Sequence, residues 1–267
     1  MSYTAPISQI THTLARIARL DDLAATGAFP NFDPELVGPI LDEANKLARD
    51  VLAPLNPIGH KTGAKLTDTG VVAAPGLSDA YRQFVEGGWM GLAFPEAFGG
   101  QGLPKPLALA VFEMIHGANM AFGLCPLLSF GAIEALLAHG SEELQQTYLP
   151  KLISGEWTGT MNLTEPQAGS DVGALVTKAV PNGDGSYAIS GQKIYITWGD
   201  HDMTPNIIQL VLARLPDAPA GSKGISLFVA PKFFVNADGS LGERNSFKCI
   251  GLEHKMGIHA SPTCVME

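Results

Sequence analysis

The chain has 267 residues, 46% of them hydrophobic and 16% charged, with a formal net charge of −9 at pH 7. This length and composition are typical of a soluble globular protein with one or two domains. The acidic balance argues against a general nucleic-acid or anionic-membrane surface, because such a surface needs a basic face.

Targeting and redox signals favour a cytoplasmic protein. The N-terminus lacks the basic start and apolar core of a signal peptide. The most apolar stretch, residues 122–138, contains Pro126 and Glu134. It is therefore shorter than the roughly 18 to 20 uninterrupted apolar residues of a membrane span, and we predict a buried helix. The three cysteines are widely spaced and lack a C-x-x-C arrangement, so reduced packing thiols are expected.

Helical patterns fill the first 155 residues. An amphipathic segment at residues 10–23 is followed by Asp33, a capping carboxylate placed before Pro34. Apolar residues then recur at helical spacing until Pro54, where we expect the helix to stop. After a Gly-, Pro- and Thr-rich connection at residues 55–77, we expect further helices at about 78–87, 106–119, 127–139 and 141–152. We predict an all-helical domain over residues 1–155.

After Trp157 the pattern changes to short runs of β-forming residues separated by turns. We predict strands at residues 157–164, 176–180, 187–189, 191–199, 207–213, 225–230, 247–252 and 263–266. The sequence Asn-Gly-Asp-Gly at residues 182–185 is a hairpin signal. Strands at such short intervals predict a small antiparallel barrel or sandwich over residues 156–267, so the predicted fold class is α+β.

Two motifs in the second half indicate a ligand site. Residues 161–171, Met-Asn-Leu-Thr-Glu-Pro-Gln-Ala-Gly-Ser-Asp, predict a strand that breaks into a small-residue loop. Backbone N–H groups of such a loop could cradle a phosphate, and Gly169 would allow close approach. Residues 191–199, Gly-Gln-Lys-Ile-Tyr-Ile-Thr-Trp-Gly, predict a strand with Tyr195 and Thr197 on one face, where both could contact one planar ligand.

Other titratable residues give weaker signals. Glu165 and Asp171 could form an acid/base pair, but structural hydrogen bonding is the preferred interpretation. His201, His254 and His259 do not form the H-x-x-x-H or clustered His/Cys pattern of a metal site, so no metal centre is predicted.

The two motifs, T-E-P-x-A-G-S-D and then G-x-K-x-[WY]-I-T about 25 residues on, resemble those of the acyl-CoA dehydrogenases, flavoenzymes that desaturate acyl-CoA thioesters. Residues 198–203 and 212–221 resemble the subgroup that includes methylmercaptopropionyl-CoA dehydrogenase. The resemblance implies an FAD cofactor, an acyl-CoA substrate, electron transfer to an electron-transfer flavoprotein and a homo-oligomer at full length. It implies a reaction in which a carboxylate removes the α-proton while the β-hydrogen leaves as hydride to flavin N5.

The resemblance also implies roles for single residues. The residues implied to bind FAD are Met161, Leu163, Thr164, Gly169, Ser170, Tyr195, Ile196 and Thr197. Among them, Thr164 lies near the N1/O2 edge, and Gly169 and Ser170 form the pyrophosphate loop, where Ser170 also contacts acyl-CoA. Tyr195 stands where the family often has tryptophan and packs beside the ring, and the hydroxyl of Thr197 reaches N5.

The family's catalytic base is a glutamate in a C-terminal helical bundle, and no residue of this sequence matches it. The same bundle helps to hold FAD across a subunit interface. We therefore expect no catalytic residue in this chain, little activity from the chain alone, and uncovered apolar surface that promotes association. His259 stands where the family more often has arginine, which puts any ion pair at that position in doubt.

Three alternatives remain open from the sequence. The first is an acyl-CoA oxidase, which returns electrons to oxygen. The second is a non-catalytic truncated protein that binds acyl-CoA or a partner subunit. The third is a helical-plus-β protein without flavin.

Overall fold

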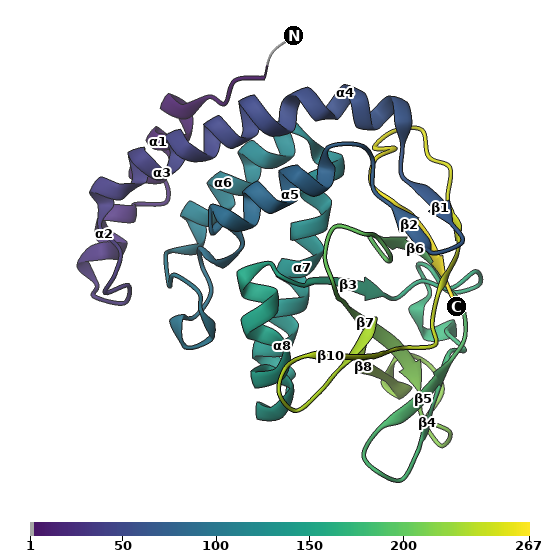
Figure 1. Ribbon diagram of the computed structural model, residues 1–267. Helices are drawn as coiled ribbons and strands as arrows, with labels where there is room; N and C mark the ends of the chain where they lie inside the picture. The colour runs from purple at the N-terminus through teal and green to yellow at the C-terminus, as the bar shows by residue number, and fades with distance from the viewer. Residues whose placement is uncertain (1–2) are drawn as a thin grey trace.

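The computed structural model describes residues 3–267. Helices occupy one half of the molecule and strands the other, with the N-terminus on the helical side (Figure 1). The helices are α1 (Ile7–Arg16), α2 (Leu20–Ala25), α3 (Val37–Lys46), α4 (Ala53–Thr62), α5 (Leu77–Glu86), α6 (Lys105–Ala118), α7 (Met120–His139) and α8 (Glu142–Ser154). One short hairpin, β1 (Lys65–Thr67) with β2 (Gly70–Val72), follows α4 in sequence but lies beside the strand half (Figure 1), where β1 contacts β11 (Cys249–Leu252).

Two helix starts are confirmed by their caps. Oδ1 of Asp33 accepts a hydrogen bond from the amide of Glu35 at 2.9 Å. Oγ of Ser141 accepts one from the amide of Leu144 at 3.3 Å, directly before α8. Each side chain satisfies a backbone donor that a helix start leaves free, which explains why these local signals were reliable.

Prolines end the helices less sharply than the sequence predicts. The helix expected to stop at Pro54 continues through α4, because a π-helical turn at Leu47–Leu52 intervenes and places Pro54 in the first turn of α4. In a first turn the missing N–H of proline costs little. Similarly, α7 begins at Met120 rather than near residue 127, because the Asn119 side chain caps it by accepting the Phe122 amide at 3.1 Å.

Helix α7 is a central helix of the core. It packs against β3 (Thr158–Asn162), α6 and α8. Its length and hydropathy alone would suit a membrane span, but half of its most apolar window is buried inside the protein. Residues 122–138 therefore lie in a helix that packs into the core on one side, while apolar side chains such as Leu127 remain exposed on the other.

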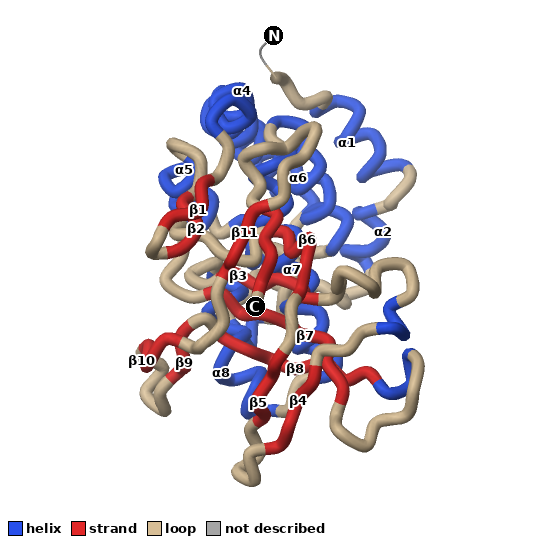
Figure 2. Tube along the Cα trace, turned by 90° about the vertical axis from the view of Figure 1, so that its right-hand side faces the viewer, coloured by secondary structure: helices blue, strands red, loops and turns tan. Residues whose placement is uncertain are grey.

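The strand half is a mixed sheet that curls into a half-barrel, with a smaller sheet beside it (Figure 2). Besides β3, the strands are β4 (Lys178–Pro181), β5 (Tyr187–Ser190), β6 (Lys193–Thr197), β7 (Ile207–Arg214), β8 (Ile225–Pro231), β9 (Phe233–Val235), β10 (Leu241–Arg244), β11 (Cys249–Leu252) and β12 (Thr263–Met266). The predicted hairpin at residues 182–185 is confirmed by the antiparallel pairing of β4 with β5.

The pairing of β7 departs from the antiparallel arrangement that the sequence predicts. β7 runs parallel to β3 and to β4, and antiparallel to β8. Parallel neighbours need a long connection, and the segment between β3 and β7, which contains three other strands, provides it. The smaller sheet has the order β11-β12-β6.

The helical and strand halves share one apolar core. Trp157, Trp198 and Ile208 from the strand half are buried in the same cluster as the side chains of α6, α7 and α8. The indole N–H of Trp198 donates to the Ala121 carbonyl of α7 at 3.1 Å. The strands near the motifs are therefore held directly by the helices.

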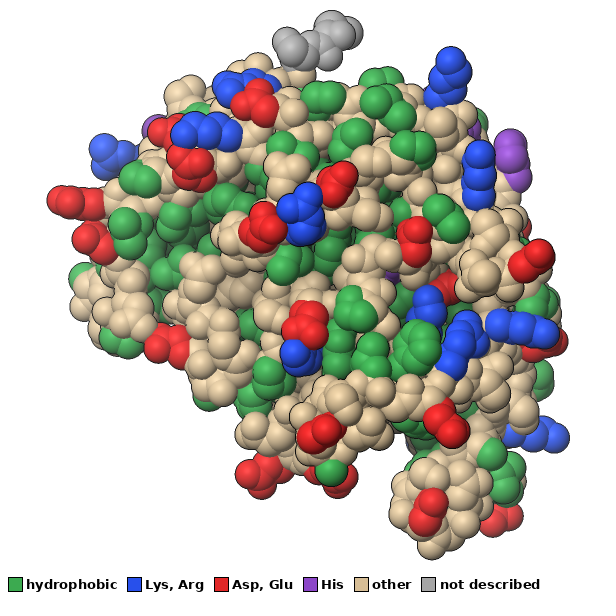
Figure 3. All heavy atoms as spheres, in the orientation of Figure 1, with side chains coloured by type: hydrophobic (Ala, Val, Ile, Leu, Met, Phe, Trp, Pro, Cys, Tyr) green, Lys and Arg blue, Asp and Glu red, His purple; other side chains and the backbone are tan. Residues whose placement is uncertain are grey.

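Apolar side chains also reach the surface of the helical half. Ile17 is 74% exposed, Leu109 64% and Leu127 44%. On the face seen in Figure 3, hydrophobic side chains lie between scattered acidic and basic groups. On this face, charged side chains separate the exposed apolar ones.

Candidate functional site

The structure brings the two sequence motifs side by side. The amide of Ile194 in β6 donates to the Thr164 carbonyl at 2.9 Å. The Thr160 hydroxyl of β3 donates to the Thr197 carbonyl at 2.7 Å. The end of β3 and the residues after it thus lie along β6, as a shared site requires.

The candidate side chains differ in exposure. Met161, Leu163, Thr164 and Thr197 are half-buried, Gly169 and Ser170 are exposed, and Tyr195 is 58% exposed. Ile196 is different, because it is only 2% exposed and packs in a second apolar cluster with Val71, Cys249, Cys264 and Met266. Only the backbone of Ile196 is available to a ligand.

A β-bulge in β6 sets these exposures. Cys264 of β12 pairs with Ile196, but Met266 pairs with Lys193, so β6 contains one extra residue. Tyr195 has φ +60° and Trp198 φ +53°, a backbone region that non-glycine residues adopt at a cost of order 1 kcal/mol or more. The bulge lets Lys193 and Ile196 both point inward while Tyr195 points to solvent, which simple alternation does not allow.

A buried ion pair joins the two motifs. Nζ of Lys193 lies 2.7 Å from Oε1 of Glu165, and their side chains are 4% and 2% exposed. The Lys193 ammonium also donates to the Leu163 carbonyl at 3.2 Å. Glu165 accepts the backbone amides of Val176 at 2.7 Å and Thr177 at 3.1 Å. One lysine and one glutamate thus hold three segments of the site together, namely residues 163–165, residues 176–177 and β6.

The environment of Glu165 keeps it ionised. Burial alone would raise its pKa, but hydrogen bonds from Lys193, Thr177 and Val176 outweigh burial and lower the pKa to about 2. Burial lowers the pKa of Lys193, and its bond to Glu165 opposes that shift. A carboxylate that is already fully hydrogen-bonded is a poor proton acceptor, so Glu165 is structural, in line with the preferred interpretation of the sequence.

The loop after Glu165 leaves room for a ligand. Glu165 and Ala168 exchange two backbone hydrogen bonds of 3.0 Å, which closes a tight turn and places Gly169 and Ser170 directly after it. A Cβ atom at Gly169 would meet only Thr164 Cγ2, at 3.9 Å, an ordinary contact. The protein's own packing therefore does not require glycine at this position, and the space beside it is available to a ligand.

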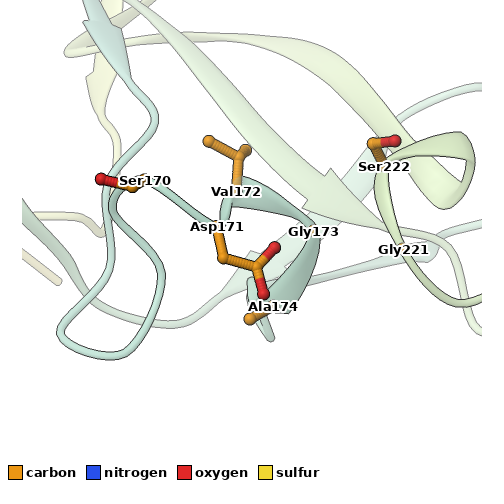
Figure 4. A pocket seen from close by; sticks show the side chains of 7 residues that line it. All are labelled: Ser170, Asp171, Val172, Gly173, Ala174, Gly221 and Ser222. Carbon is orange, nitrogen blue, oxygen red and sulfur yellow. The ribbon is translucent and has the colours of Figure 1, made fainter.

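A cleft of about 440 Å³ opens next to this loop, between Ser170–Ala174 on one side and Gly221–Ser222 on the other. Figure 4 shows Ser170 at one end, the side chains of the next residues in the middle and Ser222 across from them. Asp171 is exposed in this cleft whereas Glu165 is buried in its ion pair. The two carboxylates therefore lie in different environments and do not form an acid/base pair.

The histidines have structural contacts. His201 is fully buried, accepts the Met203 amide at Nδ1 and contacts the Thr158 hydroxyl at 3.0 Å. Burial, with Lys232 nearby, lowers the pKa of His201 to about 3. The ring nitrogens of His259 lie 2.8 Å from the carbonyls of His60 and Lys255, so His259 contacts backbone rather than a carboxylate. Within residues 3–267, no group of three His, Cys, Asp or Glu side chains is placed to hold a metal.

Sequence reasoning missed two residues that shape the site. Lys193 lies in the second motif without an assigned role, although its ammonium group forms the buried ion pair with Glu165. Arg214 was not singled out, although its guanidinium bonds to both walls of the cleft. A charged residue within a strand of β-forming residues is the one signal that could have indicated Lys193 and Arg214.

Comparison with known proteins establishes the family. The acyl-CoA dehydrogenase N-terminal domain matches residues 40–156, and the acyl-CoA dehydrogenase middle domain matches residues 160–267. The chain therefore belongs to the acyl-CoA dehydrogenase family, of which it contains these two domains.

Individual family members show how similar the chain is to known enzymes and how much of their length it covers. The chain is 46% identical over its whole length to 3-methylmercaptopropionyl-CoA dehydrogenase of Ruegeria pomeroyi, of which it covers 45%. It also resembles the structure of butyryl-CoA dehydrogenase from Megasphaera elsdenii, with a TM-score of 0.70, 24% identity and coverage of 86% of this chain and 55% of that one. An acyl-CoA dehydrogenase from Bacillus anthracis complexed with FAD gives a TM-score of 0.68 at 24% identity, covering 88% of this chain and 35% of that one. The chain thus spans less than half the length of its curated relative.

Proposed function

We propose that the chain provides the N-terminal and middle domains, divided near residue 155, of an FAD-dependent acyl-CoA dehydrogenase. The observation that supports this best is the convergence of the two motifs, which leaves the Tyr195 ring exposed beside half-buried Thr164 and Thr197. An exposed aromatic ring next to hydroxyl groups suits a planar, polar-edged ligand. The FAD complex of the Bacillus anthracis relative supports the same cofactor here.

Each candidate residue has a physical role in this proposal. FAD, when bound, supplies the acceptor for the hydride that leaves the substrate Cβ. Tyr195 packs beside the ring, and the hydroxyls of Thr164 and Thr197 offer hydrogen bonds to its polar edges. Gly169 and Ser170 offer backbone N–H groups to the pyrophosphate, and Ser170 also faces acyl-CoA in the adjoining cleft. Met161 and Leu163 add apolar contact, and Ile196 contributes through its backbone.

We propose that the catalytic base is not among residues 3–267. Glu165 is committed to Lys193 and to two backbone amides, so it has no proton-accepting role. The curated relative is more than twice as long as this chain, which leaves room for a base elsewhere in the full-length enzyme. The proposed activity implies three binding partners: an acyl-CoA substrate, an electron-transfer flavoprotein and further copies of the chain in a cytoplasmic homo-oligomer.

Substitution of Tyr195 tests the assignment of FAD as the cofactor. Titration of the chain with FAD, followed by quenching of flavin fluorescence, is expected to show saturable binding. Because an aromatic pair contributes about 0.5–1.5 kcal/mol, Tyr195→Ala is expected to raise the Kd by roughly 2- to 12-fold. Tyr187→Ala is the matched control, since Tyr187 is 42% exposed in β5 and packs against Phe228 instead. An unchanged Kd in Tyr195→Ala would contradict the proposed position of the ring.

Substitution of Gly169 tests whether its loop binds the pyrophosphate of FAD. Gly169→Ala is expected to leave thermal stability nearly unchanged, because a methyl group there meets only an ordinary contact. FAD affinity is expected to fall about tenfold, since the methyl group occupies the space of the ligand. Gly38→Ala in α3, where no atom lies within 4 Å of the added Cβ, serves as the control. A stable Gly169→Ala variant with unaltered FAD affinity would exclude this loop from the site.

A further inference from the structure

Arg214 links the two walls of the Ser170 cleft. It lies at the end of β7, where its Nη2 donates to the Gly173 carbonyl of the first wall and its Nε to the carbonyl of Leu175, directly after that wall, at 2.9 Å. On the second side, Nη1 donates to the Pro219 carbonyl at 3.0 Å and Nη2 to the Gly221 carbonyl at 2.8 Å. One guanidinium therefore connects both walls through four backbone carbonyls.

Neither wall has a regular framework of its own. The first contains the 3-10 turn Val172–Ala174 and the second the 3-10 turn Ser222–Gly224, each only three residues long. These turns contact each other, but they are not paired by a strand ladder. The guanidinium thus replaces the ladder that would otherwise fix their separation.

The second wall is shaped around the guanidinium. A Cβ atom on Gly224 would lie 1.8 Å from the Pro219 carbonyl oxygen and 2.6 Å from Nη1 of Arg214. Gly221, next to the cleft, has φ +78°, which glycine adopts without strain. Two glycines therefore let the backbone close around one side chain.

The guanidinium also places a positive charge beside the cleft. Within the described part of the chain, no Asp or Glu oxygen lies within 4 Å of it, and the four hydrogen bonds that it donates all go to neutral carbonyls. The cleft of about 440 Å³ is also lined by the exposed carboxylate Asp171. The guanidinium offsets the charge of this carboxylate, so an anionic ligand is not repelled from the cleft.

We propose that Arg214 is a positioning residue for substrate binding, which sets the spacing of the cleft walls and attracts the phosphates of the CoA moiety. Arg214 acts through the walls, because four of its five N–H groups donate to the backbone carbonyls that hold them. This inference rests on the proposed function, since it takes the cleft beside Ser170 as the acyl-CoA site.

Calorimetric titration of the chain with CoA, with FAD titrated separately, tests the proposal. Arg214→Gln removes both the positive charge and the guanidinium group that donates to four carbonyls, so it is expected to raise the Kd for CoA at least tenfold. Arg214→Lys keeps the charge but cannot bond four carbonyls, so it is expected to raise the Kd about three- to fivefold and to keep the salt dependence of binding. The Kd for FAD is expected to rise much less than the Kd for CoA in both variants, because Ser170 is the one residue of the walls that also contacts FAD, whereas a general loss of folding would weaken both ligands equally.

The control and the contrary outcomes separate this inference from the proposed function. Arg244→Lys is the control, because Arg244 also donates to two backbone carbonyls, of Asn245 and Phe247, but in another loop. One outcome is that the unmodified chain and both Arg214 variants bind CoA with the same Kd. This outcome overturns the role of Arg214, while the proposed function stands. If the unmodified chain binds neither FAD nor CoA, both are overturned.

Discussion

Replacement of Lys193 by methionine is expected to lower the free energy of unfolding by about 3–5 kcal/mol. The change leaves the Glu165 carboxylate buried without its cation, and an unpaired buried charge is far more costly than a lost surface contact. Urea denaturation followed by tryptophan fluorescence measures the difference, because Trp157 and Trp198 lie in the shared core.

Two further variants make the result specific to the buried pair. Lys151→Met breaks a pair whose side chains are 39% and 46% exposed, so it is expected to cost less than about 1 kcal/mol. The double variant Lys193→Met with Glu165→Gln removes both charges and is expected to recover part of the loss. A cost for Lys193→Met no larger than that for Lys151→Met would show that the pair contributes little.

Stability at acid pH is expected to depend strongly on Glu165. Its pKa falls from 4.5 to about 2 on folding, so its contribution is present above about pH 4.5 and is lost as the pH falls through about 2. A fall in the pKa from 4.5 to about 2 corresponds to a contribution of about 3 kcal/mol to the free energy of unfolding. Glu165→Gln is expected to lower stability at pH 7 and to flatten the fall in stability between pH 4.5 and 2.

Urea midpoints at a series of pH values measure this contribution. Asp184→Asn is the matched control, because hydrogen bonds to Ser186 also lower the pKa of Asp184 but this side chain is exposed, where solvent screens the effect. The control is expected to keep the slope of the unmodified chain. An equally steep slope in Glu165→Gln would assign the acid sensitivity to other carboxylates.

Local signals in the sequence predicted local structure well. The caps at Asp33 and Ser141 and the turn at residues 182–185 depend on residues only a few positions apart, and each is present in the structure. The strands Ile207–Arg214 and Thr263–Met266 were also found within one residue of the predicted ranges. In these cases the backbone has few alternatives to the conformation that the side chains prefer.

Non-local contacts explain what the sequence could not predict. The parallel pairing of β3 with β7 joins segments more than 40 residues apart, and neither strand alone encodes its direction. The helix past Pro54 depends on the π-helical turn before it. The candidate site was located by its motifs, but the bulge at Tyr195 and the four-carbonyl binding by Arg214 arise only when distant segments meet.

The hairpin β1–β2 depends on residues that are made much later in synthesis. Two strands of three residues form only a marginal hairpin, and this one is held by Asp200, which accepts the Val71 amide at 3.2 Å, and by Asp202, which accepts the Ala73 amide at 2.9 Å. Each bond joins residues 129 positions apart. The amides of Val71 and Ala73 should therefore gain protection from hydrogen exchange only after the second half of the chain has folded, which makes this hairpin a late-forming clasp between the two halves.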